Sequence, residues 1–191
     1  MKRIFPLMIV LILSMITCPA QFYKSILPSP AFSDSLNTIV KDFRSNYYNI
    51  QGEVVSEQDD VDIYQSKSSL PGALECFVYR FHSVQDTSAS LQAIMYKGES
   101  YKEAARIYRN TFRLVNKTKL HLNTAGGSFN GSLEEPTENL RFASSHLKAN
   151  SSDVAYKNFV AEIEMVNNYT GWEVRLNLHN KKDDKDKYLQ Q

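Results

Sequence analysis

The chain has 191 residues, of which 42% are hydrophobic and 12% aromatic, and its formal net charge is +1. This apolar content excludes a disordered chain, and the balanced charge provides no basic field that would attract nucleic acid or an anionic lipid surface. The composition therefore predicts a folded, globular protein that has no nucleic acid among its partners.

The first twenty residues have the pattern of a signal peptide. Lys2 and Arg3 are followed by an apolar run over 4–16, and Cys18-Pro19-Ala20 offers small residues for cleavage. The run has about 13 residues, whereas a membrane-spanning helix needs about 20. We therefore expect residues 1–20 to be removed, which leaves an exported periplasmic or extracellular protein without a transmembrane span.

The two cysteines leave one alternative open. Cys18 could carry a lipid anchor, although Thr17 suits a lipid-attachment signal poorly. If Cys18 leaves with the signal peptide, Cys76 is the only thiol and no intramolecular disulfide can form. Cys76 alternates with Leu74 and Val78, which predicts a buried, unreactive side chain.

The mature chain begins with a segment containing Pro28 and Pro30, expected to be extended over 21–31. A single α+β domain is predicted over 32–180, opening on a helix capped by Ser33 or Asp34. The apolar stripe of this helix has helical spacing: Leu36, Ile39, Val40, Phe43 and Tyr47.

Segments with a period of two follow this helix. We expect strands over 50–54, 61–63 and 73–83, and a hairpin partner over 91–96 after a turn near Asp86. Ser100 and Glu103 then form a capping box for a second helix. Its apolar positions again have helical spacing: Ala104, Ile107, Tyr108, Thr111, Phe112 and Val115.

Further strands are expected over 117–123, 140–146, 159–166 and 172–178, the last two joined by a turn. The stretch with Gly126, Gly127 and Gly131 is interpreted as a surface loop. It lacks the strand, lysine and helix of a phosphate-binding loop. Residues 181–191 are mostly charged, which predicts a disordered tail.

The predicted fold is an antiparallel sheet of about seven to eight strands with two amphipathic helices on one face. Each half of the chain consists of a helix and about four strands, which is compatible with an internal duplication. This order of elements resembles that of cystatin-like and secretion-chaperone-like folds. No motif accompanies the resemblance, so it implies no activity and no site residue.

No metal or cofactor site is predicted. None of the four histidines, His82, His121, His146 and His179, stands in a metal-ligand spacing, and no cofactor motif is present. His121 and His179 are expected to face solvent, and His146 to be either a satisfied, partly buried imidazole or a residue at the end of its strand. Asp59, Asp60 and Asp62 could hold calcium, but they lack the pattern of a calcium loop, which favours a solvated turn.

Aromatic side chains offer the strongest hint of a binding site. Phe77, Tyr79, Phe81 and Tyr96 could line a groove for an apolar or sugar-like ligand, because tyrosine combines a flat face with a hydroxyl. Packing against the helices explains the same residues, and both interpretations stay open.

We therefore expect an exported, non-enzymatic binding or interaction module whose partner is an unknown protein or a small ligand. One alternative is a small hydrolase or metal-dependent enzyme whose site is assembled from distant residues such as His121, His179 and Glu135. The other alternative is a structural or assembly component of the cell envelope.

Overall fold

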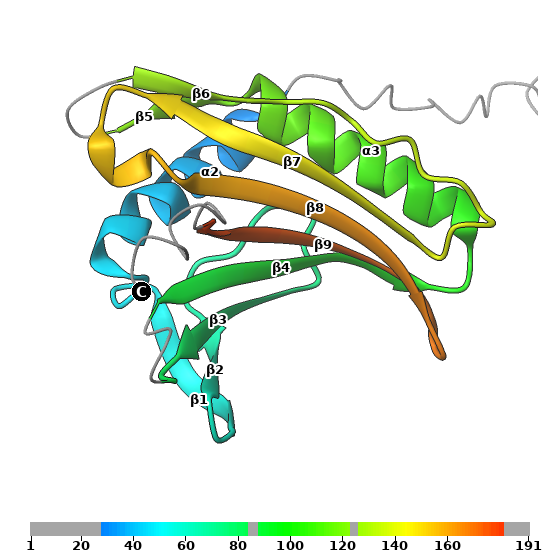
Figure 1. The fold of residues 1–191 in the computed structure, drawn as a ribbon, viewed down its shortest axis with the longest axis horizontal. Helices are drawn as coiled ribbons and strands as arrows, with labels where there is room; N and C mark the ends of the chain where they lie inside the picture. Colours follow the sequence, from blue (N-terminus) through cyan, green and yellow to red (C-terminus); the bar gives the residue numbers. More distant parts are fainter. Residues whose placement is uncertain (1–27, 84–87, 123–125, 182–191) are drawn as a thin grey trace, which may run out of the picture.

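The computed structural model describes residues 28–83, 88–122 and 126–181, which form an α+β protein with an antiparallel sheet (Figure 1). The predicted leader and nearly all of the predicted tail lie outside the described residues, as does the turn expected near Asp86. Within the described ranges, no helix combines the length and apolar character that a membrane span requires.

The sheet has nine strands in the order β1-β2-β3-β4-β9-β8-β7-β6-β5, and every neighbouring pair is antiparallel. Strand β4 therefore lies beside β9, although the two are far apart in the sequence. The strands are β1 Gln51–Glu57, β2 Val61–Ser66, β3 Glu75–Phe81, β4 Ala89–Gly98, β5 Lys119–His121, β6 Gly126–Gly131, β7 Phe142–Ser151, β8 Phe159–Asn168 and β9 Gly171–Asn180.

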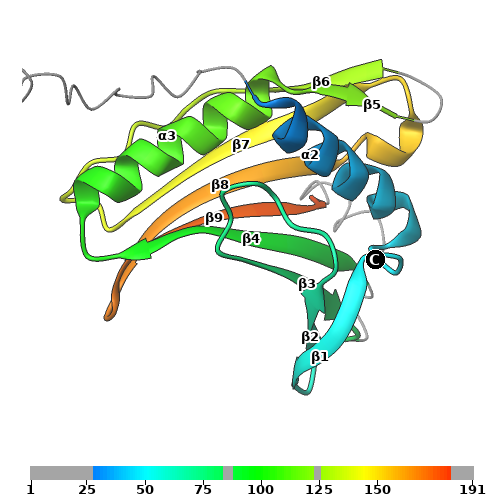
Figure 2. The same cartoon turned by 180° about the vertical axis from the view of Figure 1, so that it is seen from behind.

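Two helices, α2 (Pro30–Asp42) and α3 (Tyr101–Lys117), lie on the same face of the sheet. Figure 2 shows both of them in front of the strands. Helix α2 precedes β1 to β4 and α3 precedes β5 to β9, so each half of the chain places one helix on this face. The predicted α+β class with an antiparallel sheet is confirmed. We call the opposite face of the sheet the open face.

Helix α2 begins earlier than its apolar stripe predicts. The hydroxyl of Ser29 accepts a hydrogen bond from the Phe32 N–H at 3.2 Å, and Pro30 occupies the first turn. Proline suits this position because the N–H groups of the first turn have no partner within the helix. The expected caps Ser33 and Asp34 are therefore wrong, and residues 30 and 31 belong to the helix rather than to an extended segment.

Helix α3 agrees with its sequence signature. The Ser100 hydroxyl accepts a hydrogen bond from the Glu103 N–H at 3.3 Å, as a capping residue does. Every fourth residue from Ala104 through Tyr108 to Phe112 is buried, so the apolar stripe faces the sheet.

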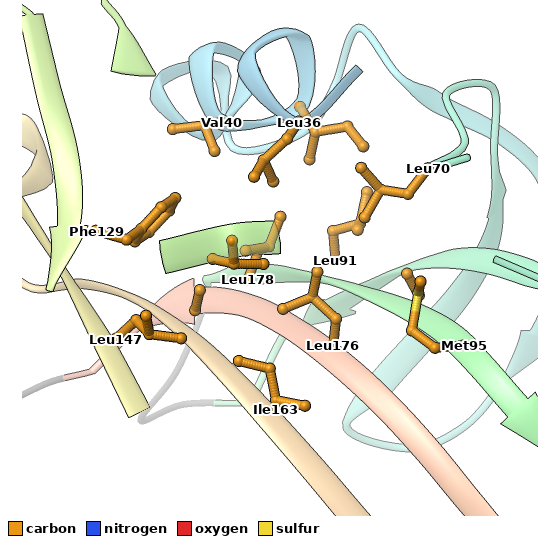
Figure 3. Packing of buried hydrophobic residues seen from close by; sticks show 14 of the residues in the cluster. Leu36, Val40, Leu70, Leu91, Met95, Phe129, Leu147, Ile163, Leu176 and Leu178 are labelled. Atoms are coloured by element: carbon orange, nitrogen blue, oxygen red, sulfur yellow. The ribbon is translucent and has the colours of Figure 1, made fainter. Parts of the chain in front are cut away.

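The core lies between the helices and the sheet, as Figure 3 shows. Side chains from α2, from the loop that joins β2 to β3, and from the strands meet there. Those labelled in Figure 3 are Leu36, Val40, Leu70, Leu91, Met95, Phe129, Leu147, Ile163, Leu176 and Leu178. The predicted alternation is clearest in β8 and β9, where every second residue is buried.

Strand β6 corrects the prediction of a glycine loop and brings the strand count to nine. It pairs with β5 on one side and β7 on the other. A Cβ atom at Gly131 would overlap the backbone carbonyl oxygen of His146, and one at Gly127 would lie 2.9 Å from that of Asn150. These glycines therefore permit a close approach to β7 rather than a flexible loop.

We expect Gly131→Ala to lower the free energy of unfolding by about 1–3 kcal/mol, because the neighbouring atoms belong to the backbone of β7 and cannot move aside. Gly126→Ala is the matched control at the other end of β6, where the nearest atom to a new Cβ is 3.9 Å away. Urea unfolding measures both variants. Equal losses in the two variants would contradict a close approach at Gly131.

Candidate functional site

The open face carries a hollow of about 360 Å³ where β3, β4, β9 and β8 run side by side. Its size falls within the range of about 300–1,000 Å³ that is typical of small-ligand sites. We call it the open-face hollow, and both aromatic and hydrogen-bonding side chains line it: Tyr79, Phe81, Ser88, Ser90, Gln92, Glu162, Asn177, His179 and Asn180.

A chain of hydrogen bonds crosses the four strands at the hollow. The Tyr79 hydroxyl donates to Gln92 Oε1 at 3.1 Å, and Gln92 Nε2 donates to Asn177 Oδ1 at 2.9 Å. Asn177 Nδ2 in turn donates to Glu164 Oε2 at 2.8 Å. Each group is oriented by the next, so the polar lining is held in a fixed arrangement before any ligand arrives.

Glu162 is the most strongly held carboxylate of the open face. Its Oε2 lies 3.2 Å from His179 Nε2, and its Oε1 lies 2.7 Å from His146 Nε2. The Ser144 hydroxyl also donates to Oε1 at 2.8 Å. The hydrogen bond with His179, aided by Ser144 and His146, outweighs the effect of burial and lowers the pKa of Glu162 to about 2. The carboxylate is therefore ionised at neutral pH.

The aromatic side of the hollow comes from β3. Tyr79 and Phe81 project to the open face at alternate positions, whereas the intervening Arg80 projects to the helix side and hydrogen-bonds to Gln51. Burial is the largest cause that raises the pKa of Tyr79, so its hydroxyl stays protonated and donates. Flat rings next to fixed hydrogen-bonding groups can hold a ring-shaped ligand that has hydroxyls at its edge.

Three of the four aromatic residues predicted to form a groove share the open face. Tyr79 and Phe81 line the hollow, and Phe77 lies on the same face of β3 without lining it. Tyr96 lies on the other face, because the register of β4 shifts after Ile94. Tyr96 pairs with the buried Val174 and packs against the core, so packing accounts for it.

Several polar residues of the hollow were not singled out by the sequence. Gln92, Asn177 and Glu162 were not among the predicted site residues. For Asn177 and Glu162 the available signal is the shared alternation of β8 and β9, which places polar residues at every second position of two paired strands. His179, expected to be solvated, instead contacts Glu162, and His146 fits its prediction as a partnered, partly buried imidazole.

The residues named for a hydrolase do not meet. His121 belongs to the edge strand β5, where its backbone N–H donates to Asn37 Oδ1, and His179 belongs to the central strand β9. Glu135 lies 2.7 Å from Arg109 Nε of α3. The three residues lie on separate elements, and the side chains of His179 and Glu135 have separate partners, so the structure brings them into no common site.

Metal and thiol chemistry find no support in the residues that the structure describes. No group of three or more metal-ligating side chains is arranged there to hold an ion. Asp62 contacts His82 and the Tyr64 hydroxyl.

Cys76 is 2% exposed, and burial raises the pKa of its thiol, in agreement with a buried, unreactive residue. The neighbouring Leu74 is exposed, since β3 begins only after it.

The fold and the hollow together define the class of protein: an α+β protein whose helices cover one face of an antiparallel sheet and whose other face presents a lined hollow. Comparisons of the chain with protein-family models, with curated proteins and with solved structures gave no match.

Proposed function

We propose that the protein is an exported, non-enzymatic binding module that takes a small sugar-like ligand in the open-face hollow. The observation that carries this proposal is the juxtaposition of Tyr79 and Phe81 with hydrogen-bonding groups from three further strands. Aromatic faces bind the apolar face of a sugar ring, and the polar groups can exchange hydrogen bonds with its hydroxyls.

The polar lining is suited to hydroxyl groups, which both donate and accept. Glu162 supplies an ionised acceptor, while Gln92 and Asn177 supply amide groups. The hydrogen bonds among Tyr79, Gln92 and Asn177 hold these groups in place, so binding needs little further ordering of side chains. This preorganisation favours recognition of a ligand over simple solvation of the sheet.

The ionisation state of Glu162 favours a binding function over glycoside hydrolysis. A glycosidase needs one carboxylic acid that remains protonated near neutral pH. Glu162 has the opposite property, since its pKa is lowered to about 2. Its carboxylate can accept hydrogen bonds from a ligand but does not act as a proton donor at neutral pH.

Export is proposed on the basis of residues 1–20, whose charged start, short apolar run and small residues are typical of a cleaved leader. The mass of the N-terminal peptide of the protein purified from its own cells tests this part. A mature start at Gln21 supports cleavage, and a diacylated Cys18 would indicate a lipid anchor instead. An intact leader would contradict export by cleavage.

The binding proposal is tested by calorimetric titration of the purified protein with a panel of methyl glycosides of common hexoses and N-acetylhexosamines. We expect at least one of them to bind, and Tyr79→Ala to weaken that binding about tenfold through loss of the stacking face. Tyr169→Ala is the matched control, because Tyr169 is fully exposed at the tip of the β8–β9 hairpin.

Two results would contradict the proposal. In one, no glycoside of the panel binds. In the other, the alanine variants at Tyr79 and Tyr169 bind as well as the unaltered protein does.

A further inference from the structure

A second hollow, larger and more apolar, lies on the opposite side of the sheet. It has a volume of about 700 Å³ and is bounded by α3, by the start of α2 and by the turn at Pro71 and Gly72. Figure 2 shows the loop that joins β2 to β3 reaching across this face toward the helices. We call it the helix-side groove, and it shares no lining residue with the open-face hollow.

The groove has an apolar interior. Phe32 and Met95 are buried at its base, while Ile107 and Leu114 of α3 are half-buried along its wall. Ile107 and Leu114 stand seven residues apart, so the wall extends about 10 Å along the helix. An elongated hollow with this lining suits an alkyl chain, because the chain removes apolar surface from water along its whole length.

The charged side chains that line the groove are all positive. Two of its lining residues are arginines, Arg106 and Arg113, and none carries a carboxylate. Arg106 is already paired with Glu103 at 2.8 Å. Within the described ranges Arg113 has neither an ion pair nor a side-chain hydrogen bond, so its exposed guanidinium is available to an anion.

We propose that the helix-side groove binds a fatty acid, with the alkyl chain lying along α3 between Ile107 and Leu114 and the carboxylate at Arg113. The volume is within the range of ligand sites for small molecules. The carboxylate matches the fork of donors that arginine presents. This binding is independent of the sugar-like ligand proposed for the open face.

Isothermal titration of the purified protein with laurate and with dodecyltrimethylammonium, both below their micelle concentrations, tests the proposal. The two probes have chains with the same number of carbon atoms, counting the carboxylate carbon of laurate, and heads of opposite charge. We expect laurate to bind at least about tenfold more tightly. Absence of laurate binding, or equal affinities for the two probes, would overturn the proposal.

Two charge-reversal variants on α3 locate the carboxylate. Arg113→Glu is expected to weaken laurate binding about tenfold or more. Lys102→Glu makes the same change of charge at an exposed residue of α3 outside the groove and should leave the affinity nearly unchanged. Equal losses in both variants would show attraction to the overall charge and would overturn the site.

A third variant separates this proposal from the one for the open face. Tyr79→Ala should bind laurate as the unaltered protein does, because Tyr79 lies on the other side of the sheet. A loss of laurate affinity in Tyr79→Ala would place the fatty acid in the open-face hollow and overturn the assignment to the groove. Circular dichroism of each variant verifies that it has folded.

Discussion

Phe112→Ala is expected to lower the free energy of unfolding by about 3–5 kcal/mol, the cost of removing a large aromatic side chain from a packed core. Phe112 is 7% exposed and lies on the buried stripe of α3, one turn after Tyr108. The side chain therefore belongs to the core that lies between this helix and the sheet. Equilibrium unfolding in urea at neutral pH measures the change.

Asn116→Ala is the matched control for Phe112→Ala, since Asn116 is exposed on the same helix. Its effect should stay within about 0.5 kcal/mol. A loss below about 1 kcal/mol for Phe112→Ala would mean that α3 does not pack through this face.

The second large effect is expected for Glu162→Gln, whose free energy of unfolding should differ from that of the unaltered protein by an amount that depends on pH. Hydrogen bonding with His179 is the largest cause that lowers the pKa of Glu162 from its usual 4.5 to about 2 in the folded protein. The side chain is 19% exposed, so solvent screens the interaction only partly. A shift of this size corresponds to about 3 kcal/mol of stability that Glu162→Gln should remove at neutral pH.

The direction of the pH dependence follows from the lowered pKa. An ionised Glu162 stabilises the folded state above the pKa of about 4.5 that it has when unfolded, and this contribution is lost as the pH falls toward 2. The difference in unfolding free energy between Glu162→Gln and the unaltered protein should therefore shrink between pH 4.5 and 2.

Glu164→Gln is the control for this series, because Glu164 lies on the same strand and face but has Asn177 as its partner. Its pH profile should follow that of the unaltered protein. A constant difference for Glu162→Gln across this pH range would contradict the lowered pKa.

Elements whose sequence signals lie within a few residues of one another were predicted correctly from the local pattern. The capping box at Ser100 and the stripe that includes Phe112 placed α3, and the alternation ending at Leu178 placed β9. Each of these signals combines a regular spacing with a clear boundary, so nothing distant in the chain was needed to interpret them.

Elements that depend on distant contacts escaped prediction. Strand β6 looked like a loop because glycines carry no periodicity, and its role becomes visible only where Gly131 meets the backbone of His146. The register shift after Ile94, which turns Tyr96 to the helix side, likewise follows from pairing with β9. Such pairings have no signature within one strand.

The candidate site was predictable only in part for the same reason. Tyr79 was singled out because aromatic residues alternate along β3, but its polar partners lie on other strands. Leu91 of β4 pairs with Leu178 of β9, and this long-range pairing brings Gln92 next to Asn177. The sequence contains these residues but not the order of the strands that assembles them.

Binding of a sugar-like ligand in the open-face hollow is tested by an NMR titration of the isotopically labelled protein with the methyl glycoside that binds most tightly. We expect amide signals to shift mainly at the strands around the open-face hollow, at Tyr79, Gln92, Asn177 and His179. Shifts confined to the helices, or no shifts at saturating glycoside, would contradict binding in this hollow.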